Sequence, residues 1–178
     1  MAAEEQKEKW LNYLALTTII LAVCATLSTF QGGKYSTRSV LMQTQAANQW
    51  AYYQSKSIKG YLYEIQRESL ELETKKAKVS RAMMSEYEKK IDIYNQKIKK
   101  YEEEKALISK EAKKLEAVRD DAQRHSQIYG LAVIFLQIAI LLSGISALMK
   151  KKYVWILGMA TGVVGLVYFA NGFILIFY

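Results

Sequence analysis

The residue types that most often perform chemistry in proteins are scarce in this sequence. There is one histidine, His125, and one cysteine, Cys24, among the 178 residues. Cys24 lies inside a long apolar run and has no second cysteine with which to form a disulfide within the chain. His125 follows the charged run Arg119–Asp120–Asp121, which is most simply interpreted as a solvated helix end. No carboxylate pair has the basic or apolar surroundings of a general acid and base.

Signals for cofactors and nucleic acids are also missing. The sequence contains no glycine-rich phosphate loop and no His/Cys spacing typical of a metal site. The formal net charge of +8 comes from 25 Lys and Arg against 17 Asp and Glu. These charges are spread along the chain, whereas nucleic-acid binding needs a dense basic face. We therefore predict no catalytic residue, metal, cofactor or nucleic-acid partner, and a protein that is not an enzyme.

Three apolar stretches predict that the chain is anchored in a lipid bilayer. Residues 11–30, 128–149 and 153–178 are each long enough, at 1.5 Å per residue, to cross a hydrocarbon core of about 30 Å. Trp10 and Tyr13 stand at the edge of the first stretch, where amphipathic rings favour the headgroup level. The sequence thus predicts an all-α membrane protein with three transmembrane helices after a short polar head at residues 1–10.

The segment between the first two spans, residues 31–127, is charged, free of proline and helical in pattern. Because each flank crosses the membrane once, both ends of this segment must emerge on the same membrane face. The sequence therefore predicts a long antiparallel, coiled-coil-like helical hairpin with its turn near residues 75–81. Gly32 and Gly33 lower the cost of a bend where the chain leaves lipid, and Ser36, Thr37 or Ser39 could cap the helix that follows.

The first half of this segment carries an apolar series at seven-residue spacing, which defines one helix face. Its members are Ala51, Ile58, Ile65 and Leu72, joined by Leu62. Trp50, Tyr52 and Tyr53 form an aromatic cluster that is either a partner contact or a packing surface for a second helix. Gly60 marks either a kink or a close helix contact.

The second half has the clearest heptad pattern, which predicts a coiled-coil seam. The seam residues are Met84, Tyr87, Ile91, Tyr94, Ile98, Tyr101, Ile108 and Leu115. Lys105, Arg119 and Ser126 interrupt it, and polar seam positions weaken a coiled coil while fixing its register. Tyrosine is bulky for a tight two-stranded coil, so the pattern favours an irregular antiparallel pairing.

Small residues in the last two spans predict close helix packing. They are Gly144 in the second span and Gly158, Gly162 and Gly165 in the third. The pattern alone leaves packing within one chain and packing between subunits open. Gln137 and Asn171 are polar groups within the spans and are expected to face protein rather than lipid.

The distribution of lysines predicts an orientation in the membrane. The run 150–152 and the polar head with Lys7 and Lys9 lie on the same side, and the positive-inside rule places both in the cytoplasm. This arrangement puts the hairpin on the outer, periplasmic side. Basic residues near the membrane ends of the hairpin oppose it, but long segments count for less in that rule.

Two parts of the chain resemble a known family. Residues 10–18 (WLNYLALTT) with 32–41 (GGKYSTRSVL), and residues 49–59 (QWAYYQSKSIK), are similar to a family of small, mostly bacterial membrane proteins described only as a domain of unknown function. The resemblance implies a multi-pass protein of the bacterial inner membrane, with one span, a polar helical region and two further spans. It implies no activity and no site residues.

These observations favour a non-enzymatic scaffold or interaction protein that self-associates through its transmembrane and coiled-coil helices. The expected partners are the bilayer, further copies of the chain and another membrane or envelope protein. The alternative is a homo-oligomeric channel or transport-type assembly, in which Gln137, Asn171 and the threonines of the first span would line a pore.

Overall fold

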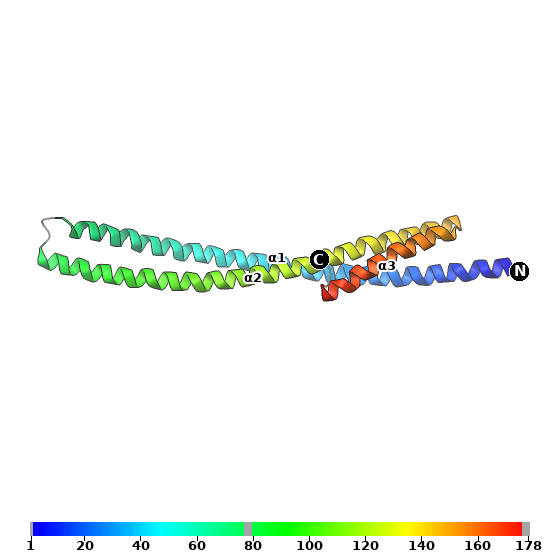
Figure 1. The fold of residues 1–178 in the computed structure, drawn as a ribbon, viewed down its shortest axis with the longest axis horizontal. Coiled ribbons are helices and arrows are strands. Elements are labelled where there is room, and N and C mark those ends of the chain that lie inside the picture. Colours follow the sequence, from blue (N-terminus) through cyan, green and yellow to red (C-terminus); the bar gives the residue numbers. More distant parts are fainter. Residues whose placement is uncertain (1, 77–79, 176–178) are drawn as a thin grey trace. The chain divides into compact units, whose positions relative to one another are not determined.

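The computed structural model describes residues 2–76 and 80–175, and this part of the chain is helical with no strand. The helices are α1 (Ala2–Thr74), α2 (Arg81–Met149) and α3 (Lys152–Ile174) (Figure 1). All three are long and apolar enough to cross a membrane, judged by length and composition. The prediction of an all-α chain is confirmed, and its three apolar stretches lie in three different helices.

The two long helices correct the helix boundaries expected from the sequence. Gly32 and Gly33 do not end a helix, because α1 continues through both of them. Thr37 is therefore not a cap, and its hydroxyl donates to the Gly33 carbonyl one turn earlier (3.0 Å). The charged run before His125 is not a helix end either, since α2 continues to Met149.

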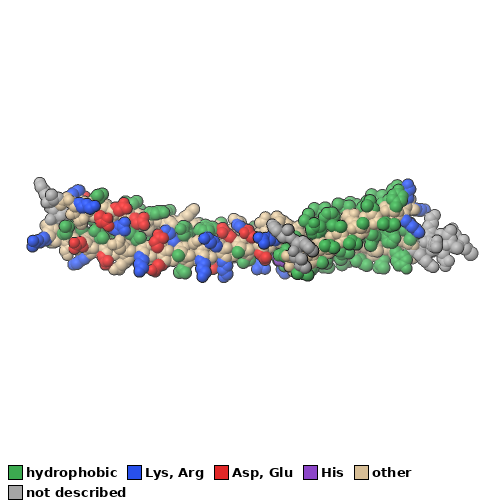
Figure 2. All heavy atoms as spheres, in the orientation of Figure 1, with side chains coloured by type: hydrophobic (Ala, Val, Ile, Leu, Met, Phe, Trp, Pro, Cys, Tyr) green, Lys and Arg blue, Asp and Glu red, His purple; other side chains and the backbone are tan. Residues whose placement is uncertain are grey.

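The chain divides into two compact units. Unit 1 consists of the described residues of Met1–Val40 and Arg119–Tyr178, and unit 2 of those of Leu41–Val118. Hydrophobic side chains dominate the visible surface of unit 1, whereas Lys, Arg, Asp and Glu gather over unit 2 (Figure 2). The two units thus carry the surfaces expected of a lipid-embedded and a water-exposed part.

In unit 1 the three helices pack around small and aliphatic side chains. The core consists of Leu21 and Ala25 of α1 with Leu136 and Ala139 of α2, all buried. Helix α3 contacts both partners: the Tyr168 ring stacks on Phe135 of α2 with centroids 5.6 Å apart. Its Phe169 and Phe173 rings also lie against Tyr129 of α2, and its Trp155 indole donates to Thr17 of α1.

The connection between α2 and α3 is short and closed by a side chain. Lys150 adopts a left-handed conformation (φ 52°), and Lys151 precedes the first helical residue of α3. The Ser146 hydroxyl donates to the Lys151 carbonyl (2.9 Å). The same carbonyl also accepts the backbone N–H of Val154 (3.3 Å), so Ser146 adds a second bond at the start of α3.

In unit 2, residues of α1 and α2 meet in pairs whose order runs in opposite directions along the two helices. Going up α1, the partners are Trp50–Glu116, Lys56–Glu104, Tyr63–Tyr101 and Arg67–Asn95. Helix α1 ends at Thr74 and α2 begins at Arg81, so residues 75–80 of the expected turn at 75–81 lie between them and Arg81 belongs to α2. Residues 77–79 of that turn lie outside the described residues, as do residues 176–178 of the predicted third span.

The face of α1 that meets α2 differs from its apolar face. Ala46 (1% exposed) and Gly60 are buried against α2, together with the aromatic and charged residues of the pairs above. By contrast, Ile58 and Ile65 are 60% and 63% exposed, and Leu72 is also exposed. The seven-residue apolar series of α1 therefore faces outward in unit 2.

Candidate functional site

Three glycines of α3 bring this helix against its neighbours in unit 1. A Cβ atom at Gly158 would lie 3.1 Å from the Leu142 Cβ, and one at Gly165 would lie 2.8 Å from the Leu136 Cγ. At Gly162 the added atom would meet a methyl carbon of Leu21 in α1 at 3.1 Å. These distances are shorter than ordinary van der Waals contact, so the backbone of α3 approaches as closely as it does only because the side chains are missing.

The other polar and small residues of the spans differ in how far they are buried within the chain. Asn171 is buried (5% exposed), whereas Gln137 is exposed in the single chain, although both were expected to face protein. Gly144 is also exposed, and nothing lies within 4 Å of the position of its Cβ atom. Gly144, a predicted packing residue, thus makes no close packing contact with the described residues of the chain.

The hydroxyl groups of the first span are satisfied by their own helix. Thr18 and Ser28 donate to the carbonyls of Leu14 (2.7 Å) and Cys24 (2.8 Å), four residues earlier. Thr17 bonds the Leu14 carbonyl and also accepts from the Trp155 indole of α3 at 3.3 Å. Such bonds leave few polar groups to line a passage.

His125 lies in a packed cluster that joins all three helices of unit 1. Its ring stacks on Tyr35 of α1 with centroids 4.3 Å apart, and its Nδ1 lies 2.7 Å from the Gly172 carbonyl oxygen of α3. Tyr129 is fully buried beside it, also stacked on Tyr35. The geometry assigns His125 a packing and hydrogen-bonding role, instead of the solvated position expected from the sequence.

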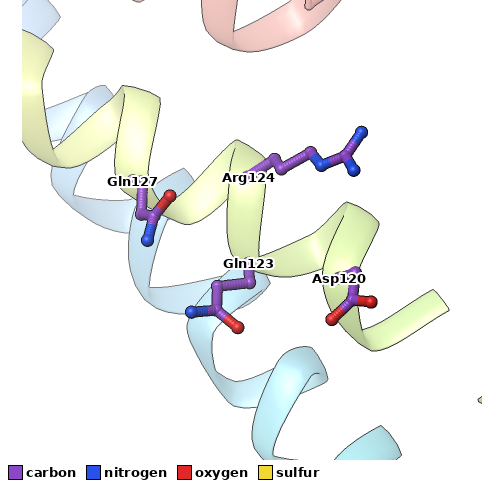
Figure 3. A pocket seen from close by; sticks show the side chains of 4 residues that line it. All are labelled: Asp120, Gln123, Arg124 and Gln127. Carbon is purple, nitrogen blue, oxygen red and sulfur yellow. The ribbon is translucent and has the colours of Figure 1, made fainter. Parts of the chain in front are cut away.

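A polar hollow in unit 1 lies next to this cluster. It has a volume of about 220 Å³ and is lined by Asp120, Gln123, Arg124 and Gln127. All four belong to α2, and their side chains spread along the helix instead of converging on one point (Figure 3). A single carboxylate without a nearby nucleophile or base supplies no catalytic arrangement.

The polar interruptions of the seam in α2 each have a partner. Lys105 is buried (9% exposed), donates to the Glu102 carboxylate and lies over the rings of Tyr53 and Tyr61. Its pKa is raised, chiefly by the bond to Glu102. In unit 1, the Ser126 hydroxyl donates to the Gly32 carbonyl of α1 at 3.1 Å. Such pairing allows polar seam positions to fix the register of two helices.

The ion pair Lys56–Glu104 connects the two helices of unit 2. The Lys56 ammonium lies 2.6 Å from the Glu104 carboxylate and 5.5 Å from the centre of the Tyr101 ring. Hydrogen bonding to Lys56 lowers the pKa of Glu104, and the same bond, together with one to Tyr52, raises the pKa of Lys56. Most of the predicted seam residues lie on this side of α2, half-buried or buried, although Met84 is 38% exposed.

The predicted aromatic contact residues are divided between the inside and the outside of unit 2. Trp50 donates through its indole N–H to Glu116 of α2 (2.9 Å) and packs edge-on against Tyr53. Both are half-buried, whereas Tyr52 is 50% exposed. Tyr52 alone of the three is half uncovered, and a contact with another molecule at this cluster stays a prediction.

Sequence reasoning missed the contacts that depend on partners far along the chain. His125 and Gly172 are separated by 47 residues, and Trp155 and Thr17 by 138. The spacing of apolar residues along one helix does not predict which distant residues form such pairs. The signal that was present is the position of Trp10 and Trp155 near span ends, and these two rings are 6.4 Å apart.

Within the described residues, no three His, Cys, Asp or Glu side chains are grouped so that they could hold a metal ion. Fold and site together define a class of protein: a helical chain with three helices able to cross a membrane, in which polar helices pair through aromatic and ionic contacts. The chain belongs to the family described as Domain of unknown function (DUF4337), whose model matches residues 10–175. No curated protein and no solved structure matches the chain.

Proposed function

We propose that this protein is a membrane-anchored scaffold that self-associates, with its polar helices forming an antiparallel hairpin that offers a surface to other copies or to a partner protein. The inner membrane of a bacterium, with the hairpin on the periplasmic side, is the location that the lysine distribution and the family resemblance support. The proposed role needs no catalysis, metal or cofactor.

One observation carries the proposal: the apolar face of α1 in unit 2 is exposed. Ile58, Ile65 and Leu72 lie seven residues apart and are each about two-thirds exposed. Ala51, Ile58, Ile65 and Leu72 form an uncharged strip, and Glu68, three residues after Ile65, borders it. An exposed, uncharged apolar strip on an otherwise charged surface is typical of a protein–protein contact.

A second copy of the chain fits this strip better than a different protein does. Copies inserted in the same membrane in the same orientation present their α1 helices in parallel and at equal height. Each residue of the strip would then lie near its own counterpart, and the absence of charges avoids like-charge repulsion. Seven-residue spacing keeps such a strip turned toward a parallel neighbour.

The test is the native mass of the full chain in mild detergent. We expect a defined multiple of 20.4 kDa, reduced by Ile58→Glu combined with Ile65→Glu. The matched control is Gln45→Glu combined with Gln66→Glu, which adds the same charge to exposed positions of α1 outside the strip. A wild-type particle containing one chain and no other protein would refute the proposal.

A channel is the alternative function, and it receives less support. A pore would need Gln137, Asn171 and the threonines of the first span as its lining. Asn171 is buried within the chain, and the hydroxyls of Thr17 and Thr18 bond to their own helix. Ion flux through liposomes containing the full chain, lost on Asn171→Leu, would favour the channel over the scaffold.

A further inference from the structure

Gln137 is a polar side chain at the centre of an apolar helix segment, and it has no partner there. It lies midway along residues 128–149, its side chain is exposed, and no described residue forms a hydrogen bond with its amide. A primary amide has two N–H donors and a carbonyl acceptor. Hydrocarbon offers no partner to any of them, so leaving this group in lipid is costly.

Other polar groups of the spans show how the chain deals with this cost. Ser143 of the same helix donates to the Ala139 carbonyl (2.9 Å), and Thr161 of α3 bonds the Leu157 carbonyl (3.0 Å). Asn171 is buried among the helices. Gln137 differs from these because its amide is neither bonded to its own helix nor covered by a neighbour.

The residues on either side of Gln137 leave its helix face open. Gly130 and Gly144 lie seven residues before and after it, and seven residues are nearly two full helix turns. Both glycines are exposed, and nothing lies within 4 Å of where their Cβ atoms would be. The glycines of α3 differ, since each of them already touches a side chain of the same chain.

We propose that this face of α2, defined by Gly130, Gln137 and Gly144, binds the same face of a second copy within the membrane, with the two Gln137 amides bonded to each other. This inference rests on the proposed self-association and names a surface for it. Copies inserted in the same orientation place Gln137 at the same depth, and an amide complements itself because it both donates and accepts. Seven-residue spacing suits the left-handed crossing common in membrane helix pairs, and glycine allows the close approach.

The test uses disulfide cross-linking of the full chain in membranes. In a Cys24→Ala background, which removes the only native cysteine, Gly144→Cys and Gly130→Cys each place a thiol on the proposed face. Leu131→Cys is the matched control, because it is exposed and directly follows Gly130 but is turned about 100° or more from the proposed face. We expect disulfide-linked dimers from the first two variants and few from the control.

A second variant tests the amide itself. Gln137→Leu removes the hydrogen bonds while preserving the apolar character of the helix, and it should weaken dimerisation in detergent by about threefold to thirtyfold, the range measured for interhelical hydrogen bonds in membranes. Ile138→Leu, one residue further along the helix, should leave dimerisation unchanged.

The outcomes separate this inference from the proposed function. A multi-chain native mass without cross-links at positions 130 and 144, or with equal cross-linking at 131, overturns the Gln137 interface and leaves self-association standing. A single-chain native mass overturns both. A cross-link from position 144 to another polypeptide overturns the assignment of a second copy.

Discussion

Replacing Gly165 by alanine tests whether α3 is held in place by close packing within the chain. A Cβ atom at this position would lie 2.8 Å from the Leu136 Cγ and 3.0 Å from the Leu136 backbone nitrogen. Ordinary contacts between such atoms begin near 3.4 Å. Because one of the atoms is backbone within a long helix, it cannot rotate away, and α3 must shift by about half an ångström relative to α2.

Overpacking of this kind typically costs about 1–3 kcal/mol. For a chain of this size, each kcal/mol shifts the melting temperature by about 2–4 °C. We therefore expect Gly165→Ala to melt about 2–12 °C below the wild type, measured by circular dichroism of the full chain in detergent micelles. The matched control is Gly33→Ala, since nothing lies within 4 Å of its added methyl; it should melt at or above the wild-type temperature because alanine favours helix.

Equal melting of the two variants would contradict the reasoning. It would mean that α3 does not approach α2 at Gly165 in the folded protein. A lower melting temperature for Gly33→Ala than for Gly165→Ala would show instead that the α1 glycine requires space that the structure does not indicate.

Three further predictions concern unit 2. Gly60→Ala should stabilise it by about 0.5–1 kcal/mol in thermal unfolding, because the added methyl meets the nearest side chain at an ordinary 3.8 Å and alanine favours helix; a loss of stability would contradict the close but uncrowded contact. Ile98→Asp should destabilise unit 2 by about 2 kcal/mol or more, because it places an unpaired charge at a half-buried position. Ile93→Asp, at a residue that is 51% exposed, should have little effect. Similar melting of both variants would rule out the seam. The bond to Lys56 lowers the pKa of Glu104 below its ordinary value of 4.5, so the stabilising effect of this bond is present above that pH and is lost as the pH falls through the lowered pKa. Acidification from pH 7 to about pH 3 should therefore destabilise the wild type more than Glu104→Gln. Parallel pH profiles of the two proteins would show that the pair contributes nothing to stability.

The helical nature of the chain could be predicted from its sequence, because length and composition decide it. A run of about 20 apolar residues has few alternatives to a membrane-crossing helix, and the segment between the runs contains no proline. The helix boundaries were harder to predict. Gly32 and Gly33 suggested a bend, yet α1 continues through both. A Cβ atom placed on Gly32 would lie only 3.2 Å from the Tyr129 Cβ, so this glycine allows α1 to approach α2 closely.

The packing face of α1 in unit 2 could not be read from periodicity. The apolar series through Ile58 and Ile65 is exposed, and the face against α2 contains Gly60, Lys56 and Arg67. Sequence patterns assume that apolar residues are buried and charges exposed. Here Lys56 and Arg67 of α1 are bonded to residues of α2. The sequence pattern of α1 alone cannot predict partners that lie in another helix.

The environments of Gln137 and His125 also depend on residues of other helices. His125 looked like part of a solvated charged run, but its partners are Tyr35 and Gly172, which come from two other helices. Gln137 was expected to face protein because of its chemistry alone. Its exposure in the single chain is visible only once the positions of the neighbouring helices are known.

The most direct test of the account is to count chains per assembly in the membrane where the protein is naturally made. A fluorescent protein fused before Met1, on the side proposed to be cytoplasmic, and expressed at the natural level would allow the bleaching steps of single spots to be counted. The account predicts spots with a fixed number of two or more steps, reduced by Ile58→Glu combined with Ile65→Glu. A population dominated by single steps in the wild type would contradict it.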